Sequence, residues 1–427
     1  MSHLALPICA KRSDKRLPKK KEKKPGFLRP YRVLDLADEK AVYCGKLLGD
    51  LGADVIKVEP PCGDRMRSRG PFYNNEIHPE KSLYFLYYNT SKGSVTLNLE
   101  HSDGRAIFKR LIEKTDVLLE TFPVGYLSSI GFDYSVLREF NPRLVMTSVT
   151  PFGQTGPLRN YKSSDLIAMG MSGFMQVTGD PYGLPIRFGD EQSHFAPAQY
   201  AAVATVSALY YRDAVSGKGQ HIDISMQECL NSYRSEATQE AGWHVLGENV
   251  IRQGPTSRYN FPGGLYSCKD GWIGIYVVRA KEWDALAQWM VEVTGNEELL
   301  EDKYKGGVLA RYEYRDMLEA VFLDFTGRFT AQELFHEGQK RGIAVLPVNS
   351  VADLLVDPQL AARDFWVELD HPVVGAMTYP REGIYCADMP PPRKAAPLLG
   401  EDNKRVYSGE LGYNDNDLEV LRTAGVI

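Results

Sequence analysis

The 427-residue chain has the composition of an ordinary globular protein, with 43% hydrophobic and 25% charged residues, and its length predicts two or more domains. No stretch of about 18 uninterrupted apolar residues occurs, which argues against a membrane-spanning helix. The six cysteines lie far apart without a C-x-x-C pair. This pattern argues against a zinc site or a disulfide framework and favours a cytoplasmic protein.

The net charge of -5 conceals a basic segment near the N-terminus. Residues 11–24 carry nine Lys or Arg and two acids, so the remainder of the chain is strongly acidic. Because no aromatic residue interleaves these basic residues, we expect a disordered, solvated tail over residues 1–26 rather than a nucleic-acid or membrane arm. We therefore predict neither a nucleic-acid partner nor a membrane partner.

Strand and helix patterns alternate through the first 150 residues. Buried strands are predicted at 31–36 and 54–58, around a helix over 39–51 whose apolar residues share one face. Such a strand–helix–strand unit predicts a parallel sheet with a right-handed crossover. Further strands are expected at 94–99, 117–119 and 144–149, and further helices at 103–114 and ending at 136–140. The alternation indicates an α/β fold with a doubly wound large domain.

The later part of the chain changes in texture. An alanine-rich segment at 196–212 predicts a long buried helix, and residues 221–225 predict a strand. Mixed helices and a strand near 272–278 indicate a second, smaller domain. Residues 341–427 are expected to return to strands.

The first strand is not followed by the fingerprint of a dinucleotide site. Such sites need G-x-G-x-x-G so that backbone amides can approach a pyrophosphate. Here residues 37–41 read ADEKA, and the carboxylate of Glu59 after the second strand is weak evidence alone. We therefore expect no NAD, no other permanently bound cofactor and no metal.

A series of short motifs resembles the family III (CaiB/BaiF type) CoA-transferases, with matching order and spacing from about residue 27 to the C-terminus. The motifs are VLD at 33–35, LGADVIKVE at 51–59, GD at 63–64 with Arg67, NTSK at 89–92, DVLLE at 116–120 with Phe122, IGF at 130–132, NPRL at 141–144, FGQTGP at 152–157, GKGQ at 217–220, APLLG at 396–400 and GVI at 425–427.

The resemblance implies a fold and a reaction. Family members have a Rossmann-like large domain formed by both chain ends, a smaller middle domain, and two subunits interlocked as a dimer. Here it implies a large domain over 27–226 and 336–427 and a small domain over 227–335. Members move CoA from a thioester, their substrate, to a carboxylic acid. An aspartate attacks the thioester carbonyl to form a mixed anhydride, and the released thiolate passes CoA on through a second anhydride.

The nucleophile of the family follows a Thr-Gly pair in a pattern like T-G-x-x-D-x-x-P. In this chain the pattern begins at Thr178, and Tyr182 stands at the aspartate position. A phenol, which ordinarily ionises near pH ~10, would yield an ester rather than an anhydride, so Tyr182 is expected to be catalytically silent. Asp180, two residues earlier, is a weaker candidate. Asp165 is expected to cap a helix.

The resemblance also implies CoA-contacting positions. The turn after the first strand maps to Lys40 and Ala41, without the family's A-G-P sequence. The family residues that are retained, and are expected to contact CoA, are Arg67, Asn89, Lys92 and Phe122. The cations Arg67 and Lys92 would neutralise phosphates, or else be exposed surface charges.

Three functions remain open. The first is a subunit of a heteromeric CoA-transferase, as known for benzylsuccinate activation with succinyl-CoA as donor, paired in a heterodimer or heterotetramer with a homologous subunit that supplies the aspartate. The second is a self-sufficient homodimer using Asp180. The third is a CoA-binding protein without transferase activity or an acyl-CoA isomerase. A racemase-type isomerase is disfavoured, because Ser164 stands where that group carries a histidine.

Overall fold

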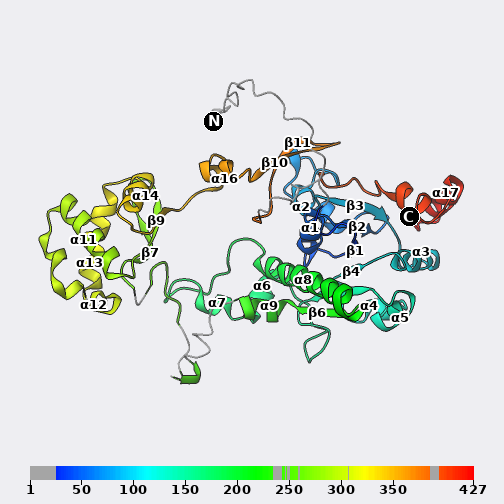
Figure 1. Cartoon of the computed structure of the whole chain (residues 1–427), viewed down its shortest axis with the longest axis horizontal. Coiled ribbons are helices and arrows are strands. Elements are labelled where there is room, and N and C mark those ends of the chain that lie inside the picture. Colours follow the sequence, from blue (N-terminus) through cyan, green and yellow to red (C-terminus); the bar gives the residue numbers. More distant parts are fainter. Residues whose placement is uncertain are drawn as a thin grey trace.

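The computed structural model describes residues 26–233, 243–245, 247, 251–257, 260–305, 307–384 and 394–427. The predicted basic tail lies outside these residues. The described chain forms two units, with the parallel sheet in one and helices α11 to α14 in the other (Figure 1).

The larger unit is built on a six-stranded parallel sheet with the order β3-β2-β1-β4-β5-β6. Its strands are β1 (Arg32–Leu36), β2 (Asp54–Glu59), β3 (Lys92–Thr96), β4 (Val117–Glu120), β5 (Val145–Thr150) and β6 (His221–Ser225). β3, β4 and β5 are buried along their whole length, because helices cover both faces of the sheet. The predicted doubly wound α/β fold is confirmed.

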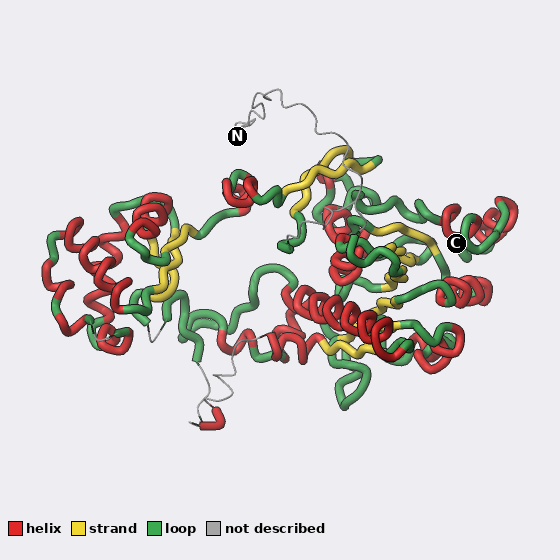
Figure 2. Tube along the Cα trace, in the orientation of Figure 1, coloured by secondary structure: helices red, strands yellow, loops and turns green. Residues whose placement is uncertain are grey.

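Two layers of helices enclose this sheet (Figure 2). One core holds α1 (Val42–Asp50), α6 (Asp165–Met171), α8 (Gln192–Tyr211) and α9 (Met226–Tyr233). The other holds α3 (Ser102–Ile112), α4 (Tyr126–Ser129), α5 (Tyr134–Phe140) and α17 (Asp415–Thr423). The C-terminal segment reaches the sheet as well, since Tyr407 donates to the carbonyl of Thr96 at 2.7 Å.

Shorter elements complete this unit. They are α2 (Leu83–Tyr88), α7 (Phe174–Val177), and the antiparallel pair β10 (Trp366–His371) and β11 (Gly375–Pro380). Helices α15 (Val351–Leu355) and α16 (Pro358–Ala362) lie on the segment that leads from the smaller unit to β10. The expected return to strands after residue 341 is therefore only partly right, because the chain ends in helix α17.

The smaller unit has its own hydrophobic core. Its sheet has the order β7-β8-β9, with β7 (Gly263–Ser267), β8 (Trp272–Tyr276) and β9 (Val345–Pro347). Helices α11 (Ala280–Thr294), α12 (Val308–Tyr312), α13 (Arg315–Gly327) and α14 (Ala331–Lys340) lie with it. The expected boundary at 336 falls inside α14, while Ile343 and Val345 still pack in this core, so the unit continues through β9. The boundary at 227 likewise falls inside α9, which packs on the larger unit.

A buried ion pair links the first and third strands of the parallel sheet. Lys92 Nζ lies 2.7 Å from Asp35 Oδ2 and also donates to the Val42 carbonyl at 2.9 Å, and both charged side chains are fully buried. β3 starts two residues earlier than predicted, because this lysine points into the protein interior. The pair also restricts the residue type at position 45 of α1 to glycine, since a Cβ there would lie 2.2 Å from Asp35 Oδ2.

We predict that Lys92→Met destabilises the fold by about 3–5 kcal/mol, because it leaves the Asp35 carboxylate buried without its cation. Equilibrium denaturation in urea measures the difference. Lys162→Met, at an exposed position, is the matched control and should change the free energy of unfolding by less than ~0.5 kcal/mol. Equal stabilities for the two variants would contradict this role.

A buried carboxyl group, that of Glu120, lies where β4 ends. Glu120 accepts a hydrogen bond from the Phe122 amide at 2.7 Å. Burial raises the pKa of its carboxyl to about 7, although hydrogen bonds from Ser148 and Phe122 act in the opposite direction. In the folded protein this group therefore keeps a proton that the unfolded chain releases at lower pH.

A carboxyl whose pKa is raised in the folded state makes the folded protein less stable as pH rises. Glu120→Gln removes this group and should therefore stabilise the protein increasingly with pH. We expect its advantage over the wild type to grow by on the order of 2 kcal/mol between about pH 5 and about pH 8. Denaturation at several pH values tests this, with the exposed Glu139→Gln as control. A difference that does not vary with pH would show that Glu120 is already ionised in the fold.

Candidate active site

A cavity of about 420 Å³ opens at the carboxyl ends of strands β1 to β4. We call it the carboxyl-edge cavity. Leu36 ends β1, Glu59 ends β2, and Leu97 and Phe122 follow β3 and β4 at its wall. The strand order reverses between β1 and β4, and in open α/β sheets ligands bind at such a switch point.

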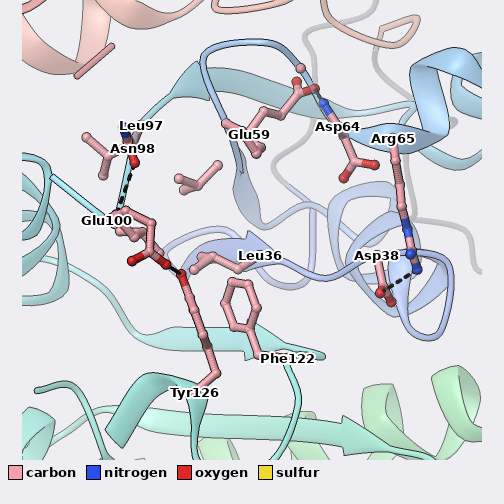
Figure 3. A pocket seen from close by; sticks show the side chains of 14 residues that line it. Leu36, Asp38, Glu59, Asp64, Arg65, Leu97, Asn98, Glu100, Phe122 and Tyr126 are labelled. Carbon is pink, nitrogen blue, oxygen red and sulfur yellow. Dashed lines mark hydrogen bonds and ion pairs between the residues drawn. The ribbon is translucent and has the colours of Figure 1, made fainter. Parts of the chain in front are cut away.

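The carboxyl-edge cavity combines an apolar floor with a charged rim. Leu36 and Phe122 lie side by side at its floor, and Arg65 points to Asp38 on the rim (Figure 3). Arg65 donates to Asp38 at 3.0 Å, and the Tyr126 hydroxyl donates to Glu100 at 2.6 Å. The cavity can therefore contact an extended part of a ligand through its apolar floor, and charged groups of the ligand through its rim.

The turn between β1 and α1 is closed by the protein's own carboxylate. Asp38 Oδ1 accepts hydrogen bonds from the Lys40 amide at 3.1 Å and the Thr121 hydroxyl at 2.8 Å. A dinucleotide fold would present a pyrophosphate to the amides at this helix start. An acidic side chain here disfavours that use, in line with the missing glycines.

Three of the residues expected to contact CoA lie in the protein interior. Arg67 binds Glu59 through Nε at 2.7 Å and Nη2 at 2.9 Å, and it binds Glu80 through Nη1 at 2.7 Å. Lys92 donates to Asn89 Oδ1 at 3.1 Å as well as to Asp35, and the side chains of Lys92 and Asn89 are completely buried. These residues are neither exposed surface charges nor part of the cavity lining. A contact between any of them and CoA stays a prediction.

The other expected positions lie at or near the cavities. Phe122 lines the carboxyl-edge cavity and packs against Tyr126 with ring centroids 4.6 Å apart. Lys40 pairs with Asp38 and lines a second cavity described below. Ala41 is fully buried at the start of α1, so only its backbone is placed to meet a ligand.

The loop that carries the nucleophile position projects from the surface. Tyr182 is 99% exposed. Asp180 is also exposed, and its Oδ1 accepts a hydrogen bond from the Tyr182 amide at 2.8 Å. The loop closes where the Ile186 amide donates to the Thr178 carbonyl at 3.3 Å. The structure thus presents a phenol at the tip and uses the nearby carboxylate to shape the turn.

Arg252, which lies outside this loop in the sequence, holds its backbone through hydrogen bonds. Its guanidinium donates to the carbonyl oxygens of Asp180 at 3.0 Å, Gly183 at 2.9 Å and Gln176 at 3.3 Å. A second link runs from the Gly254 amide to the Gly179 carbonyl at 3.0 Å. The loop conformation is therefore fixed by contacts distant in sequence.

A second cavity of about 420 Å³, which we call the charged cavity, adjoins the first. It lies between the β1–α1 turn and the starts of α6 and α8, and Arg65 lines both cavities. Its ionisable lining residues are Glu39, Lys40, Arg65, Asp165, Arg187, Glu191 and His194. The polar character of this cavity contrasts with the apolar floor of its neighbour.

Asp165 connects two helix starts at the charged cavity. Its Oδ1 accepts from the Ser193 amide in the first turn of α8 at 3.0 Å, and its Oδ2 accepts from Arg187 at 3.2 Å. The expected capping role is thus found, but at the start of α8 rather than of its own helix. Arg187, Arg65 and Arg252 were not predicted as site residues, because a single sequence shows loop arginines without their partners.

Other site classes find no support in the part of the chain that the structure describes. No group of three or more His, Cys, Asp or Glu is arranged to hold a metal ion there. Within the same residues, no helix is both long and apolar enough to cross a bilayer.

Comparison with known proteins agrees with this geometry. The family model "CoA-transferase family III" matches residues 28–403. The chain is 35% identical to the succinyl-CoA:(R)-benzylsuccinate CoA-transferase subunit BbsE of Thauera aromatica, covering 93% of this chain and 97% of that protein. It is 32% identical to the succinyl-CoA–L-malate CoA-transferase beta subunit of Chloroflexus aurantiacus, over 93% and 97% of the two chains.

A solved structure matches as well. The crystal structure of a CAIB/BAIF family protein from Brucella suis superposes with a TM-score of 0.80 at 31% identity, covering 90% of this chain and all of that one. The predicted family is confirmed by sequence and by fold. The chain belongs to CoA-transferase family III.

Proposed function

We propose that this chain is one subunit of a heteromeric CoA-transferase, which moves CoA from an acyl-CoA such as succinyl-CoA to a carboxylic acid. A homologous partner subunit supplies the aspartate that forms the acyl anhydride. The observation that carries this proposal is Tyr182, which stands fully exposed at the tip of the loop where the family pattern places that aspartate.

The chemistry of the two side chains at the loop supports a partner-supplied nucleophile. A carboxylate attacks the thioester carbonyl, the C–S bond breaks, and the anhydride formed is reactive enough to return its acyl group to the CoA thiolate. The phenol of Tyr182 would form an ester, which is a poorer acyl donor. The Asp180 carboxylate is oriented by the turn amide of residue 182 and lies two residues from the expected place.

The names of the relatives point to the same arrangement. Two of them, from Thauera aromatica and Chloroflexus aurantiacus, are named as subunits of CoA-transferases that use succinyl-CoA. By analogy, we infer a second, homologous chain here.

Exposed apolar surface supports the presence of a partner. Along α8, residues at helical spacing form an outward apolar face that includes Val203 at 69% and Tyr210 at 72% exposed. The outer face of the β7–β9 sheet is similarly apolar, with Trp272, Tyr276 and Leu346 exposed. Contiguous apolar surface of this kind marks an interface, and we propose that an interlocked partner covers both faces.

The carboxyl-edge cavity is the proposed place for the CoA thioester, which is a substrate and not a resident cofactor. Phe122 and Leu36 would contact its apolar arm, with Arg65 and Lys40 as the nearest cations for its phosphates. The buried Arg67 and Lys92 would support this wall from behind by fixing the strands.

The purified chain alone is predicted to show no CoA transfer, and activity should appear when the homologous subunit is co-expressed. In the complex, Asp180→Ala should retain at least about half of the rate, because it changes a turn and not the nucleophile. Transfer of CoA from succinyl-CoA to benzylsuccinate, followed by chromatography, is the measurement. Asp324→Ala, on an exposed helix position of the smaller unit, is the control.

Activity of the single chain that disappears with Asp180→Ala would instead establish a self-sufficient homodimer. The exposure of Asp180 is the one feature that favours this second function. Tyr182→Asp in the single chain is a complementary test. Because this change introduces the missing carboxylate, we expect the variant to transfer CoA in the same assay without the partner subunit.

A further inference from the structure

Arg187 offers the charged cavity a guanidinium that is only half used. Its Nη1 donates to Asp165 Oδ2 at 3.2 Å and to the Asp190 carbonyl at 3.3 Å. Within the described part of the chain, no residue accepts from its Nε or Nη2, and the side chain is 51% exposed. An arginine presents five N–H donors in a planar fork, so this one keeps a free edge suited to a second carboxylate.

Two other acids that line the charged cavity, Glu191 and Glu39, are already paired with side chains of the protein. Burial would raise the pKa of the Glu191 carboxyl, but the nearby His194 ring and hydrogen bonds from Arg69 and Tyr84 outweigh it and lower the pKa to about 2. On the opposite wall, Glu39 accepts from Arg65 Nε at 3.1 Å. An anion entering the cavity therefore meets acids that are already paired, and meets in Arg187 a cation with unused donors.

The charged cavity also adjoins the proposed thioester site. It shares Arg65 with the carboxyl-edge cavity, and the turn that separates them gives Asp38 to one and Lys40 to the other. Arg187 is five residues beyond Tyr182, on the segment that descends from the loop tip. An acid held here would lie next to the proposed thioester site, on a segment that also carries the nucleophile position.

We propose that Arg187 binds the non-reacting carboxylate of a dicarboxylic acid, and so makes this enzyme specific for dicarboxylates. The inference rests on the proposed function, since it places the acid beside the thioester. The reacting carboxylate must be free to attack and become acylated, so a fixed guanidinium that held it would oppose the reaction. A second carboxylate stays charged throughout and can remain bound to Arg187 in substrate and product.

The test compares matched acids on the complex of this chain with its partner. Glutarate and butyrate differ by one carboxylate, as do benzylsuccinate and 4-phenylbutanoate. The wild type should prefer the diacid of each pair, and Arg187→Gln should raise the KM for the diacid about ten- to hundredfold while the KM for the acyl-CoA stays within about twofold. The monoacids should be unaffected, so the preference collapses.

Two further variants separate recognition from folding. Arg187→Lys keeps the charge but loses the planar fork, and should recover only part of the diacid preference. Arg363→Gln changes an exposed arginine outside both cavities and should leave every KM unchanged. Circular dichroism and co-purification with the partner verify that each variant folds and assembles.

The result that overturns the inference is an Arg187→Gln complex that still transfers CoA with an unchanged diacid preference. That outcome leaves the proposed function intact. If no preparation transfers CoA, the proposed function fails, and saturation-transfer NMR with benzylsuccinate still tests Arg187. A signal in the wild-type chain that is lost in Arg187→Gln supports the carboxylate site, whereas equal signals refute it.

Discussion

Two buried ion pairs stabilise strands β1 to β3, and one of them lies at the carboxyl edge of the parallel sheet. The pair of Lys92 with Asp35 joins β3 to β1, and the two-pronged pair of Arg67 with Glu59 closes the end of β2. Arg67 also donates to the Pro397 carbonyl at 3.1 Å, which attaches the C-terminal segment to the same edge. Because a buried charge without its partner is costly, these pairs fix the wall against which the carboxyl-edge cavity forms.

The same pairs explain how charge is distributed over the site. Arg67 and Lys92, which the family resemblance assigned to CoA, pair with acids inside the protein. The arginines that line the two cavities are Arg65, which is itself paired with Asp38 and Glu39, and Arg187. Arg65 begins the short 3-10 helix after β2 and borders the proposed thioester site. Arg187 lies in the segment before α8 and borders the proposed acid site. Binding of the two substrates is thus assigned to loops, and stability to the sheet beneath them.

Sequence patterns predicted the regular parts of this fold better than the site. The strands β1, β2 and β4 were found because apolar residues run through them, whereas the start of β3 was missed because Lys92 is charged and yet buried. Tyr182 at the nucleophile position could be read from the motif alone. The hydrogen bonds from Arg252 to the loop and the unused donors of Arg187 could not be predicted from the sequence. Both depend on contacts between segments that only the folded chain brings together.

In the proposed enzyme, the carboxylate that becomes acylated belongs to the partner subunit and not to this chain. The most direct measurement is hydroxylamine trapping of the acyl-enzyme in the two-subunit complex, followed by peptide mass spectrometry. We predict a hydroxamate on an aspartate of the partner subunit and an unmodified peptide spanning residues 178–186 of this chain. A hydroxamate on Asp180, or on any other carboxylate of this chain, would contradict it.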